Sequence, residues 1–225
     1  MTIPERIKAV RHQVEDCCRT CNRNPETVLL LAVSKTKPAL DIAVAYQAGL
    51  RHFGENYVQE ALAKQVKLGA YDITWHFIGP IQSNKTKLIA QHFNWVHSVD
   101  SLRIASRLSE QRPDHLPPLN ICLQVNVSGE ASKSGIPLAE LSALCTAVVD
   151  LPRLKLRGVM TIPEPLDDYK QQCLPYKTLM SFVHELNRPE LDTFSFGMTG
   201  DLNAAIVEGA TIVRVGTALF GSRSK

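Results

Sequence analysis

Lys35 is the residue of this 225-residue chain whose type and position point most clearly to chemistry. It follows a mostly apolar run, residues 28–34, and precedes Thr36, Lys37 and Pro38. So short a run, rich in branched side chains, is typical of a buried parallel strand, and Pro38 suits the first turn of a following helix. A lysine walled by apolar residues loses solvation, which favours the neutral amine that attacks carbonyl groups. Lys35 is therefore a candidate for Schiff-base formation; the alternative is a strand-end lysine whose ammonium group reaches water.

A second group of residues has the types that bind phosphate. Residues 197–201, Gly-Met-Thr-Gly-Asp, follow one short apolar run and precede a predicted helix, so small residues, a hydroxyl and free backbone amides would lie together. Gly216 and Thr217 lie in a later predicted strand, where a glycine lets backbone N–H groups approach an anion. A plain loop with an Asp or Thr helix cap is the alternative for residues 197–201. The presence of both segments makes a phosphate site as good an interpretation as the capped loop.

Arg214 precedes Gly216 by two residues in an otherwise apolar run. Because side chains alternate along a strand, Arg214 shares a face with Gly216. A buried charge needs a partner. The partner is either a carboxylate such as Glu55 or Glu164, or an anionic or electron-rich ligand between Lys35 and the phosphate site.

Polar residues also interrupt other apolar runs. They are Glu55, Asn56, His76, Gln124 and Asn126. Such residues are unusual in a buried strand unless they bind a ligand or one another. For His76 we favour a hydrogen-bonded core histidine, whereas Asn56 comes at the end of a predicted strand and is the better ligand candidate.

Alternating strands and helices must position these residues. A predicted amphipathic helix over residues 3–21 is followed by eight candidate buried strands: 28–34, 52–55, 74–78, 95–99, 119–127, 156–161, 193–196 and 212–218. The segments between them favour helices, for example 38–48, 138–149 and 202–208. The alternation predicts parallel strands with helices outside, and eight such units fit an α/β fold, a single (β/α)8 TIM-type barrel over residues 1–225 preceded by an N-terminal helix.

The barrel explains why the candidate residues belong together. Active-site side chains of such barrels come from the C-terminal ends of the strands, and the loops after strands seven and eight commonly hold phosphate. Lys35 ends predicted strand one, and the two phosphate-binding segments fall at predicted strands seven and eight. A doubly wound sheet suits the chain less well, because its first turn is usually glycine-rich and residues 34–37 are not. The Pro-rich residues 111–118 are interpreted as a connection within one domain.

Composition argues against several other classes of protein. The 25 Lys+Arg and 22 Asp+Glu residues give a net charge of +3 without a basic stripe, so no nucleic-acid partner is expected. No segment approaches the ~20 apolar residues of a membrane span, and the charged N-terminus is unlike a signal peptide. We therefore expect a cytoplasmic protein without a membrane partner. Cys18 and Cys21 form a lone C-x-x-C, so no metal site is predicted, and the six cysteines fit reduced thiols.

A Schiff-base lysine, a phosphate site and an arginine near a ring together suit pyridoxal 5'-phosphate (PLP) as cofactor. A cofactor-independent Schiff-base aldolase acting on a sugar phosphate would fit the first two features. Seven stretches resemble motifs of the PLP homeostasis proteins, the YggS/PROSC family: residues 32–38, 53–60, 75–85, 133–135, 157–160, 195–198 and 213–221. The resemblance covers nearly the whole chain.

The resemblance implies a barrel like that of alanine racemase, with PLP held as a Schiff base on Lys35 and with Arg214 facing the pyridine nitrogen. It also implies that the phosphate is held near Thr199, Gly216 and Thr217. The family usually has Gly-Met-Ser-x-Asp where this chain has Thr199 and Gly200 at the third and fourth positions. Thr199 keeps the hydroxyl, whereas Gly200 lacks a side chain. The predicted cofactor-binding residues are Lys35, Asn56, Thr199, Arg214, Gly216 and Thr217.

The predicted function is PLP binding in vitamin B6 and amino-acid homeostasis rather than catalysis. Racemisation by two bases needs a second acid/base on the opposite face of the cofactor. The resemblance implies that alanine racemases take it from an additional domain and a dimer partner, for which this chain leaves no room after predicted strand eight. An arginine at the pyridine nitrogen would also weaken the ring as an electron sink. A racemase-like or transaminase-like PLP enzyme is the runner-up, and PLP-dependent apo-enzymes are the expected recipients of the cofactor.

Overall fold

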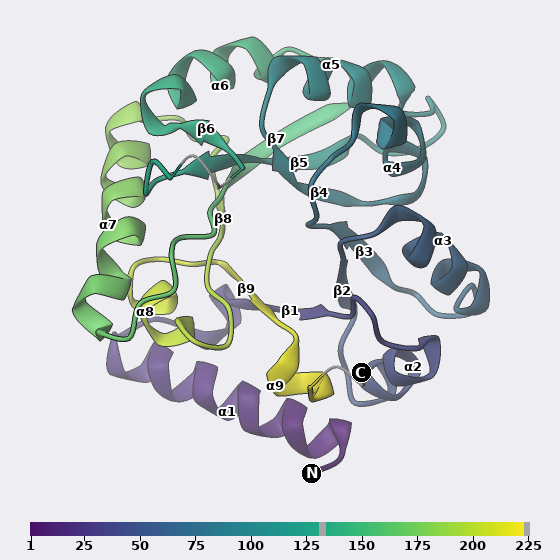
Figure 1. Ribbon diagram of the computed structural model, residues 1–225, viewed down its shortest axis with the longest axis vertical. Coiled ribbons are helices and arrows are strands. Elements are labelled where there is room, and N and C mark those ends of the chain that lie inside the picture. The colour runs from purple at the N-terminus through teal and green to yellow at the C-terminus, as the bar shows by residue number, and fades with distance from the viewer. Residues whose placement is uncertain (131–133, 223–225) are drawn as a thin grey trace.

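The computed structural model describes residues 1–130 and 134–222 and shows a closed ring of parallel strands with helices outside it (Figure 1). Lys133 of the resemblance motif lies outside the described residues. The strands of the ring, in the order in which they adjoin, are β4 (Trp95–Val99), β3 (Thr74–Phe77), β2 (His52–Glu55), β1 (Leu29–Val33), β9 (Ile212–Val215), β8 (Thr193–Ser195), β7 (Leu154–Met160) and β5 (Leu119–Asn126). Pairing of β4 with β5 closes the ring, so the predicted (β/α)8 barrel is confirmed. A short further strand, β6 (Ile136–Pro137), pairs with the end of β5.

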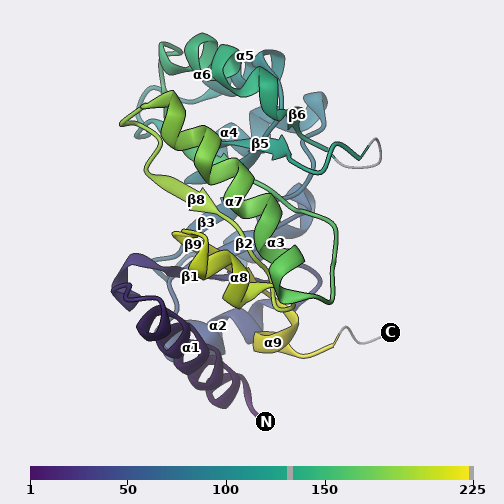
Figure 2. The same ribbon diagram turned by 90° about the vertical axis from the view of Figure 1, so that its left-hand side faces the viewer.

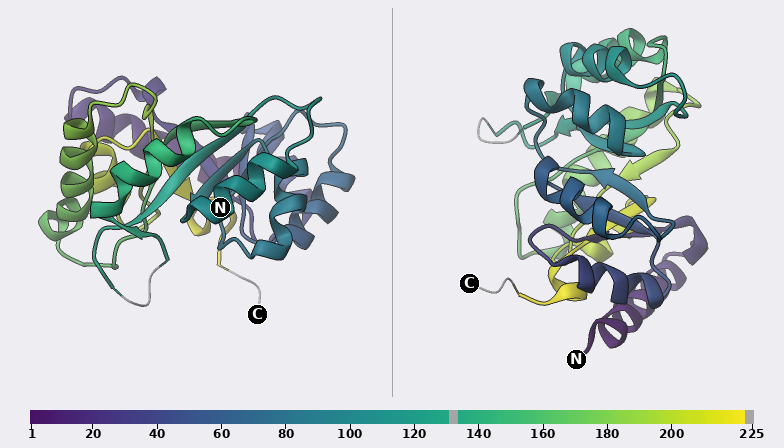
Figure 3. Two further views of the ribbon diagram at one scale, coloured as in Figure 1. Left: turned by 90° about the horizontal axis from the view of Figure 1, so that it is seen from above. Right: turned by 90° about the vertical axis from the view of Figure 1, so that its right-hand side faces the viewer.

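The helices cover the outside of the ring, as the two views of Figure 3 show. They are α1 (Ile3–Thr20), α2 (Ala39–Gln47), α3 (Val58–Lys67), α4 (Thr86–His92), α5 (Leu102–Gln111), α6 (Leu141–Val149), α7 (Tyr169–Leu186), α8 (Leu202–Val207) and α9 (Thr217–Phe220). Three short 3-10 helices, η1 (Pro25–Thr27), η2 (Ser83–Lys85) and η3 (Leu138–Glu140), lie in connections. Within the described residues, no helix is both long enough and apolar enough to cross a membrane.

Helix α1 begins where local chemistry predicts a start. Thr2 and Glu5 form a capping box, in which each side chain accepts a hydrogen bond from the backbone N–H of the other. Ile7, Val10 and Val14 recur at helical spacing and are buried. This apolar face packs against α2, α8 and α9, next to both described ends of the chain (Figure 2).

Most predicted boundaries lie within two residues of the observed ones, but the last strand is shorter than predicted. The strand predicted over residues 212–218 ends at Val215, and Gly216 and Thr217 begin the short helix α9 instead. The predicted helix 138–149 begins as the 3-10 helix η3 and becomes α-helical at Leu141. The prediction for Gly216 and Thr217 as strand residues was wrong because apolar residues resume directly after them, at 218–220, so that no change in hydrophobicity marks the end of the strand.

Candidate functional site

The C-terminal ends of the parallel barrel strands form one rim, and most of the predicted site residues lie along it. Lys35 lies two residues after β1, Asn56 follows β2 directly, and Gly216 follows β9 directly. Because β1 pairs with both β2 and β9, the structure places Lys35 between the other two. Lys35 and Asn56 are both half-buried.

Gly216 allows the ends of β9 and β1 to approach closely. A Cβ atom at Gly216 would lie 3.3 Å from the carbonyl oxygen of Val33, two residues before Lys35. Thr217 is exposed, and so is Thr199 in the loop after β8, the strand that adjoins β9. The residues predicted to bind phosphate therefore follow neighbouring strands on one side of Lys35.

The loop of residues 197–201 is shaped by Asp201. One carboxylate oxygen of Asp201 accepts a hydrogen bond from the Met198 backbone N–H (2.6 Å), and the other accepts one from the Tyr176 hydroxyl (2.5 Å). Gly197 has φ +78°, and a Cβ there would lie 2.5 Å from the Cβ of Ala205, so this turn requires glycine. Asp201 makes no side-chain cap bond to α8. The helix-cap alternative is thus wrong for Asp201, which closes the loop on itself.

Arg214 lies in the barrel interior and is almost completely buried. Its Nη1 donates to the backbone oxygen of Ser195 and, over 2.9 Å, to the Ser195 hydroxyl; its Nη2 donates to the backbone oxygen of Thr161 over 2.9 Å. Among residues 1–130 and 134–222, no carboxylate pairs with this guanidinium, since Glu55 pairs elsewhere and Glu164 is exposed. The ion pair that the sequence left open is therefore not formed. The buried positive charge favours an electron-rich ligand at the rim.

Lys64 holds the turn that carries Lys35. Its ammonium donates to the backbone oxygen of Ser34 (2.7 Å), to Glu55 Oε1 (2.7 Å) and to Glu60 Oε1 (2.6 Å), which uses all three of its N–H donors. The same oxygen of Glu60 accepts from the Thr36 backbone N–H over 2.6 Å. Thr36 has φ +63°, a conformation that β-branched residues rarely adopt. The Lys64 network thus contacts the backbone on both sides of Lys35 and holds Thr36 in its strained conformation.

Two buried oxygens beside this network have no hydrogen-bond partner among the described residues. They are Oε2 of Glu55 and Oδ1 of Asn56. A buried acceptor without a donor costs roughly 1–3 kcal/mol, and such atoms often mark the place of a ligand. Burial also raises the pKa of Glu55, although the adjacent Lys64 opposes this. The rim therefore offers a ligand at least one unused acceptor close to Lys35.

The other polar residues singled out in the strands are structural. His76 is buried and hydrogen-bonded at both ring nitrogens, as predicted for a core histidine. Gln124 donates to the backbone oxygen of Ser134, and Asn126 donates to that of Glu130, so both shape the connection after β5.

Sequence reasoning missed four residues near the site: Lys64, His97, Ser195 and Tyr176. Lys64 occupies what looks like an ordinary polar position of an amphipathic helix. His97 carried a usable signal, because histidine occurs in each of three consecutive predicted strands, at positions 52, 76 and 97.

The buried histidines are expected to make the stability of the fold depend on pH. Burial, together with the nearby charge of Arg214, lowers the pKa of His97 from 6.5 to about 3. Between these values the unfolded chain binds a proton here and the folded chain does not, so the free energy of unfolding falls as the pH falls, by about 1.4 kcal/mol per pH unit for this group. The contribution is fully present above about pH 6.5.

Between pH 6.5 and pH 4, we expect the free energy of unfolding measured with urea to fall less in His97→Gln than in the unchanged protein. His115→Gln is the matched control, because it makes the same substitution at an exposed position away from the barrel interior. Equal slopes for His97→Gln and the unchanged protein would contradict the assignment of this acid sensitivity to His97.

Comparison with known proteins adds three findings. The model of the family "alanine racemase, N-terminal domain" matches residues 6–224. A protein of Pseudomonas aeruginosa named pyridoxal phosphate homeostasis protein is 59% identical, over 99% of this chain and 96% of the relative. The protein of the same name from Escherichia coli K12 is 51% identical, over 98% of this chain and 97% of the relative.

Solved structures show the same similarity. PipY of Synechococcus elongatus, solved with PLP bound, has a TM-score of 0.85 and 40% identity, and the match covers 98% of this chain and all of PipY. Alanine racemase of Corynebacterium glutamicum has a TM-score of 0.67 at 14% identity, over 97% of this chain and 61% of the racemase. This second likeness concerns the fold alone.

Proposed function

We propose a function from family membership: the chain belongs to the alanine racemase N-terminal-domain family and, within it, to the pyridoxal phosphate homeostasis proteins. The proposed function is PLP binding in vitamin B6 and amino-acid homeostasis. The observation that carries the proposal is the PLP bound in PipY, which is 40% identical over 98% of this chain. We propose that residues 1–225 act as one PLP-binding domain.

The proposed cofactor site lies on the rim around Lys35. The Schiff base would join Lys35 Nζ to the aldehyde carbon of PLP with loss of one water. Asn56, Thr199, Arg214, Gly216 and Thr217 complete the proposed site.

The residues present fit this cofactor. Asn56 offers a buried acceptor that no described protein group uses. Thr199 and Thr217 are exposed, and their hydroxyls suit a phosphate. Gly216 lies beside Thr217 without a side chain, at the close approach of β9 to β1. Arg214 carries a permanent charge at the centre of the barrel.

Arg214 supports a carrier function over catalysis. Bound PLP supplies an aldehyde that captures amines and a ring that accepts electrons. Arg214 presents only N–H donors, so it would keep a facing pyridine nitrogen unprotonated and limit carbanion chemistry. A racemase-like or transaminase-like enzyme remains the second candidate because the barrel is shared with alanine racemase. PLP-dependent apo-enzymes are the proposed recipients of the cofactor.

The binding proposal is tested by titrating the cofactor-free protein with PLP and, separately, with pyridoxal. We expect PLP to give a yellow complex and to bind at least tenfold more tightly, because each charge-assisted hydrogen bond to phosphate contributes roughly 1.5–3 kcal/mol. Gly216→Ala is expected to weaken PLP more than pyridoxal. Equal affinities for the two compounds would show that the loops after β8 and β9 do not hold phosphate.

The choice between carrier and enzyme is tested with the PLP-loaded protein and L-alanine. Slow or absent formation of D-alanine supports the carrier function. Robust racemisation that disappears in Lys35→Ala would favour the second candidate and would leave the PLP site itself unchallenged.

A further inference from the structure

A continuous hydrogen-bonded chain of side chains crosses the barrel and ends at Arg214. His52 Nδ1 lies 2.9 Å from His76 Nε2, and His76 Nδ1 lies 2.9 Å from His97 Nε2. His97 Nδ1 then lies 2.7 Å from the Ser195 hydroxyl, which accepts from Arg214 Nη1 over 2.9 Å. We call His52, His76, His97 and Ser195 the histidine relay.

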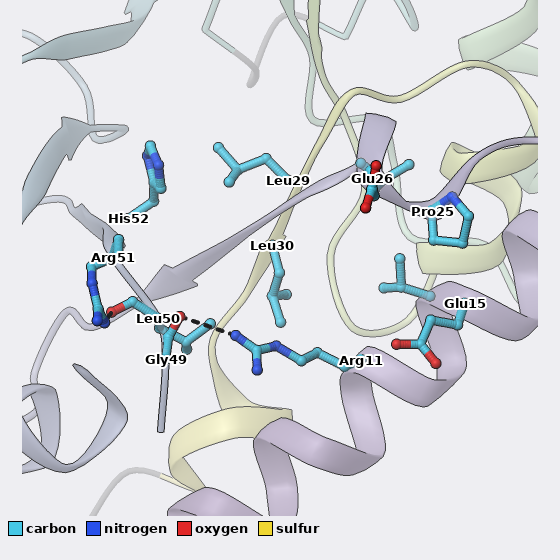
Figure 4. A pocket seen from close by; sticks show the side chains of 12 residues that line it. Arg11, Glu15, Pro25, Glu26, Leu29, Leu30, Gly49, Leu50, Arg51 and His52 are labelled. Atoms are coloured by element: carbon cyan, nitrogen blue, oxygen red, sulfur yellow. Dashed lines mark hydrogen bonds between the residues drawn. The ribbon is translucent and has the colours of Figure 1, made fainter. Parts of the chain in front are cut away.

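The histidine relay steps along three neighbouring strands and then spans the interior. His52, His76 and His97 lie on β2, β3 and β4, which adjoin in that order. Ser195 lies on β8, which does not pair with β4, so its contact with His97 crosses the barrel. His52 is half-buried and lines a surface pocket of about 450 Å³ at the N-terminal ends of β1 and β2 (Figure 4). The relay thus connects the two ends of the barrel.

Arg214 determines the direction of the first hydrogen bond. Its guanidinium offers only donors, so the Ser195 oxygen must accept from it. The single hydroxyl hydrogen of Ser195 then points to the other atom in contact with this oxygen among the described residues, Nδ1 of His97. His97 Nδ1 is therefore the acceptor and carries no proton.

The remaining directions follow one by one. A neutral imidazole has one N–H and one acceptor nitrogen, so His97 carries its proton on Nε2 and donates to His76 Nδ1. His76 must then carry its proton on Nε2 and donate to His52 Nδ1. His52 also carries its proton on Nε2. A charge on β9 thus determines the tautomer of a histidine on β2.

Burial keeps the rings in this neutral form. Desolvation lowers the pKa of all three histidines, and Arg214 lowers that of His97 further. A protonated His76 would present two N–H donors and could not accept from His97. The relay therefore has one consistent arrangement at neutral pH.

We infer that the histidine relay is a positioning device for Arg214, in which a one-directional chain of hydrogen bonds holds the Ser195 hydroxyl ready to accept from the guanidinium. Arg214 sets the direction, and the relay in return keeps the guanidinium in one orientation toward the rim. Ser195, His97 and His76 are positioning residues that act through Arg214. The effect of these residues on a cofactor rests on the proposed function, whereas the tautomers of the histidines do not depend on it.

The inference is tested in the cofactor-free full-length protein by two-bond ¹H–¹⁵N NMR of the histidine rings at pH 7. We expect single Nε2–H tautomers for His52, His76 and His97. In Arg214→Glu the introduced carboxylate accepts from Ser195, and all three rings should change to Nδ1–H.

If the buried carboxylate of Arg214→Glu prevents folding, two serine variants still test the inference. Ser195→Ala removes the link to Arg214, and the three rings should lose their single-tautomer signature. Ser98→Ala is the matched control, because Ser98 is equally buried on β4 but donates to the backbone oxygen of Gly79. In Ser98→Ala the rings of His52, His76 and His97 should remain Nε2–H. An Nδ1–H tautomer in the unchanged protein, or unchanged tautomers in Ser195→Ala, would overturn the inference.

The effect on a bound cofactor is measured separately by adding PLP to both serine variants. Ser195→Ala should shift the absorption maximum and the pH titration of the bound PLP, and Ser98→Ala should not. If neither these variants nor the unchanged protein binds PLP, the proposed function fails while the tautomer result stands. If PLP binds and Ser195→Ala leaves its spectrum and titration unchanged, the positioning role is wrong.

Discussion

Lys35→Ala is expected to abolish the adduct that borohydride fixes between the protein and PLP, together with the yellow colour of the complex. The reason is that a Schiff base needs a primary amine, and Lys35 is the lysine at the end of β1, between Asn56 and Gly216. The measurement is absorbance before and after reduction, followed by peptide mapping of the modified lysine. Weak residual PLP binding through the phosphate is compatible with this result.

The matched control is Lys37→Ala, two residues along the same turn. The ammonium of Lys37 donates to the backbone oxygen of Ser222 over 2.8 Å, so it has a structural partner on the C-terminal segment. We expect this variant to keep the yellow complex. Recovery of the reduced adduct mainly on Lys37 in the unchanged protein would refute the assignment to Lys35.

Lys64→Met is expected to lower the free energy of unfolding by about 3–5 kcal/mol, the usual cost of removing one partner from a buried ion pair. The substitution leaves the carboxylates of Glu55 and Glu60 without their cation and removes the Lys64 hydrogen bond to the backbone oxygen of Ser34. The strained turn at Thr36 also loses the group that orients Glu60. The measurement is urea unfolding at pH 7.5 without PLP.

Lys67→Met, on the same helix and exposed, is the control and should change stability by less than about 0.5 kcal/mol. A loss in Lys64→Met no larger than that of the control would show that the network does not stabilise the turn. In the surviving folded fraction we also expect slower capture of PLP, because the Lys64 network no longer holds the backbone at Ser34 and Thr36, on either side of Lys35.

Lys35→Ala and Lys64→Met test two different roles, that of the lysine proposed to react with PLP and that of the lysine that stabilises its turn. Lys35→Ala removes the proposed reacting atom from a half-buried position after β1 and should leave the fold intact. Lys64→Met leaves the reacting atom in place and removes the ion pairs beneath it. A loss of stability in the first variant, or normal stability with lost binding in the second, would reverse these assignments.

The sequence by itself determined the architecture and the position of Lys35 at the end of the first strand. Short apolar runs alternating with amphipathic segments reflect local burial, and eight of them in succession predict a barrel without knowledge of any contact. Parallel strands bring their C-terminal ends to one rim, so the location of Lys35, Asn56 and Gly216 on this rim follows from their positions along the chain. The end of the last strand could not be placed, because apolar residues continue from β9 into α9.

Only the tertiary structure decided which buried polar groups meet. His97 and Ser195 are 98 positions apart in the chain, and Lys64 reaches back 30 positions to Ser34. No local pattern specifies such partners, because a hydrogen bond depends on distances set by how the whole barrel closes, whereas burial periodicity depends only on neighbours in sequence. Arg214 shows both sides of this division. Its alternation with Gly216 placed it on an inward face, but packing decided that neutral oxygens of Ser195 and Thr161, and not a carboxylate, receive its hydrogen bonds.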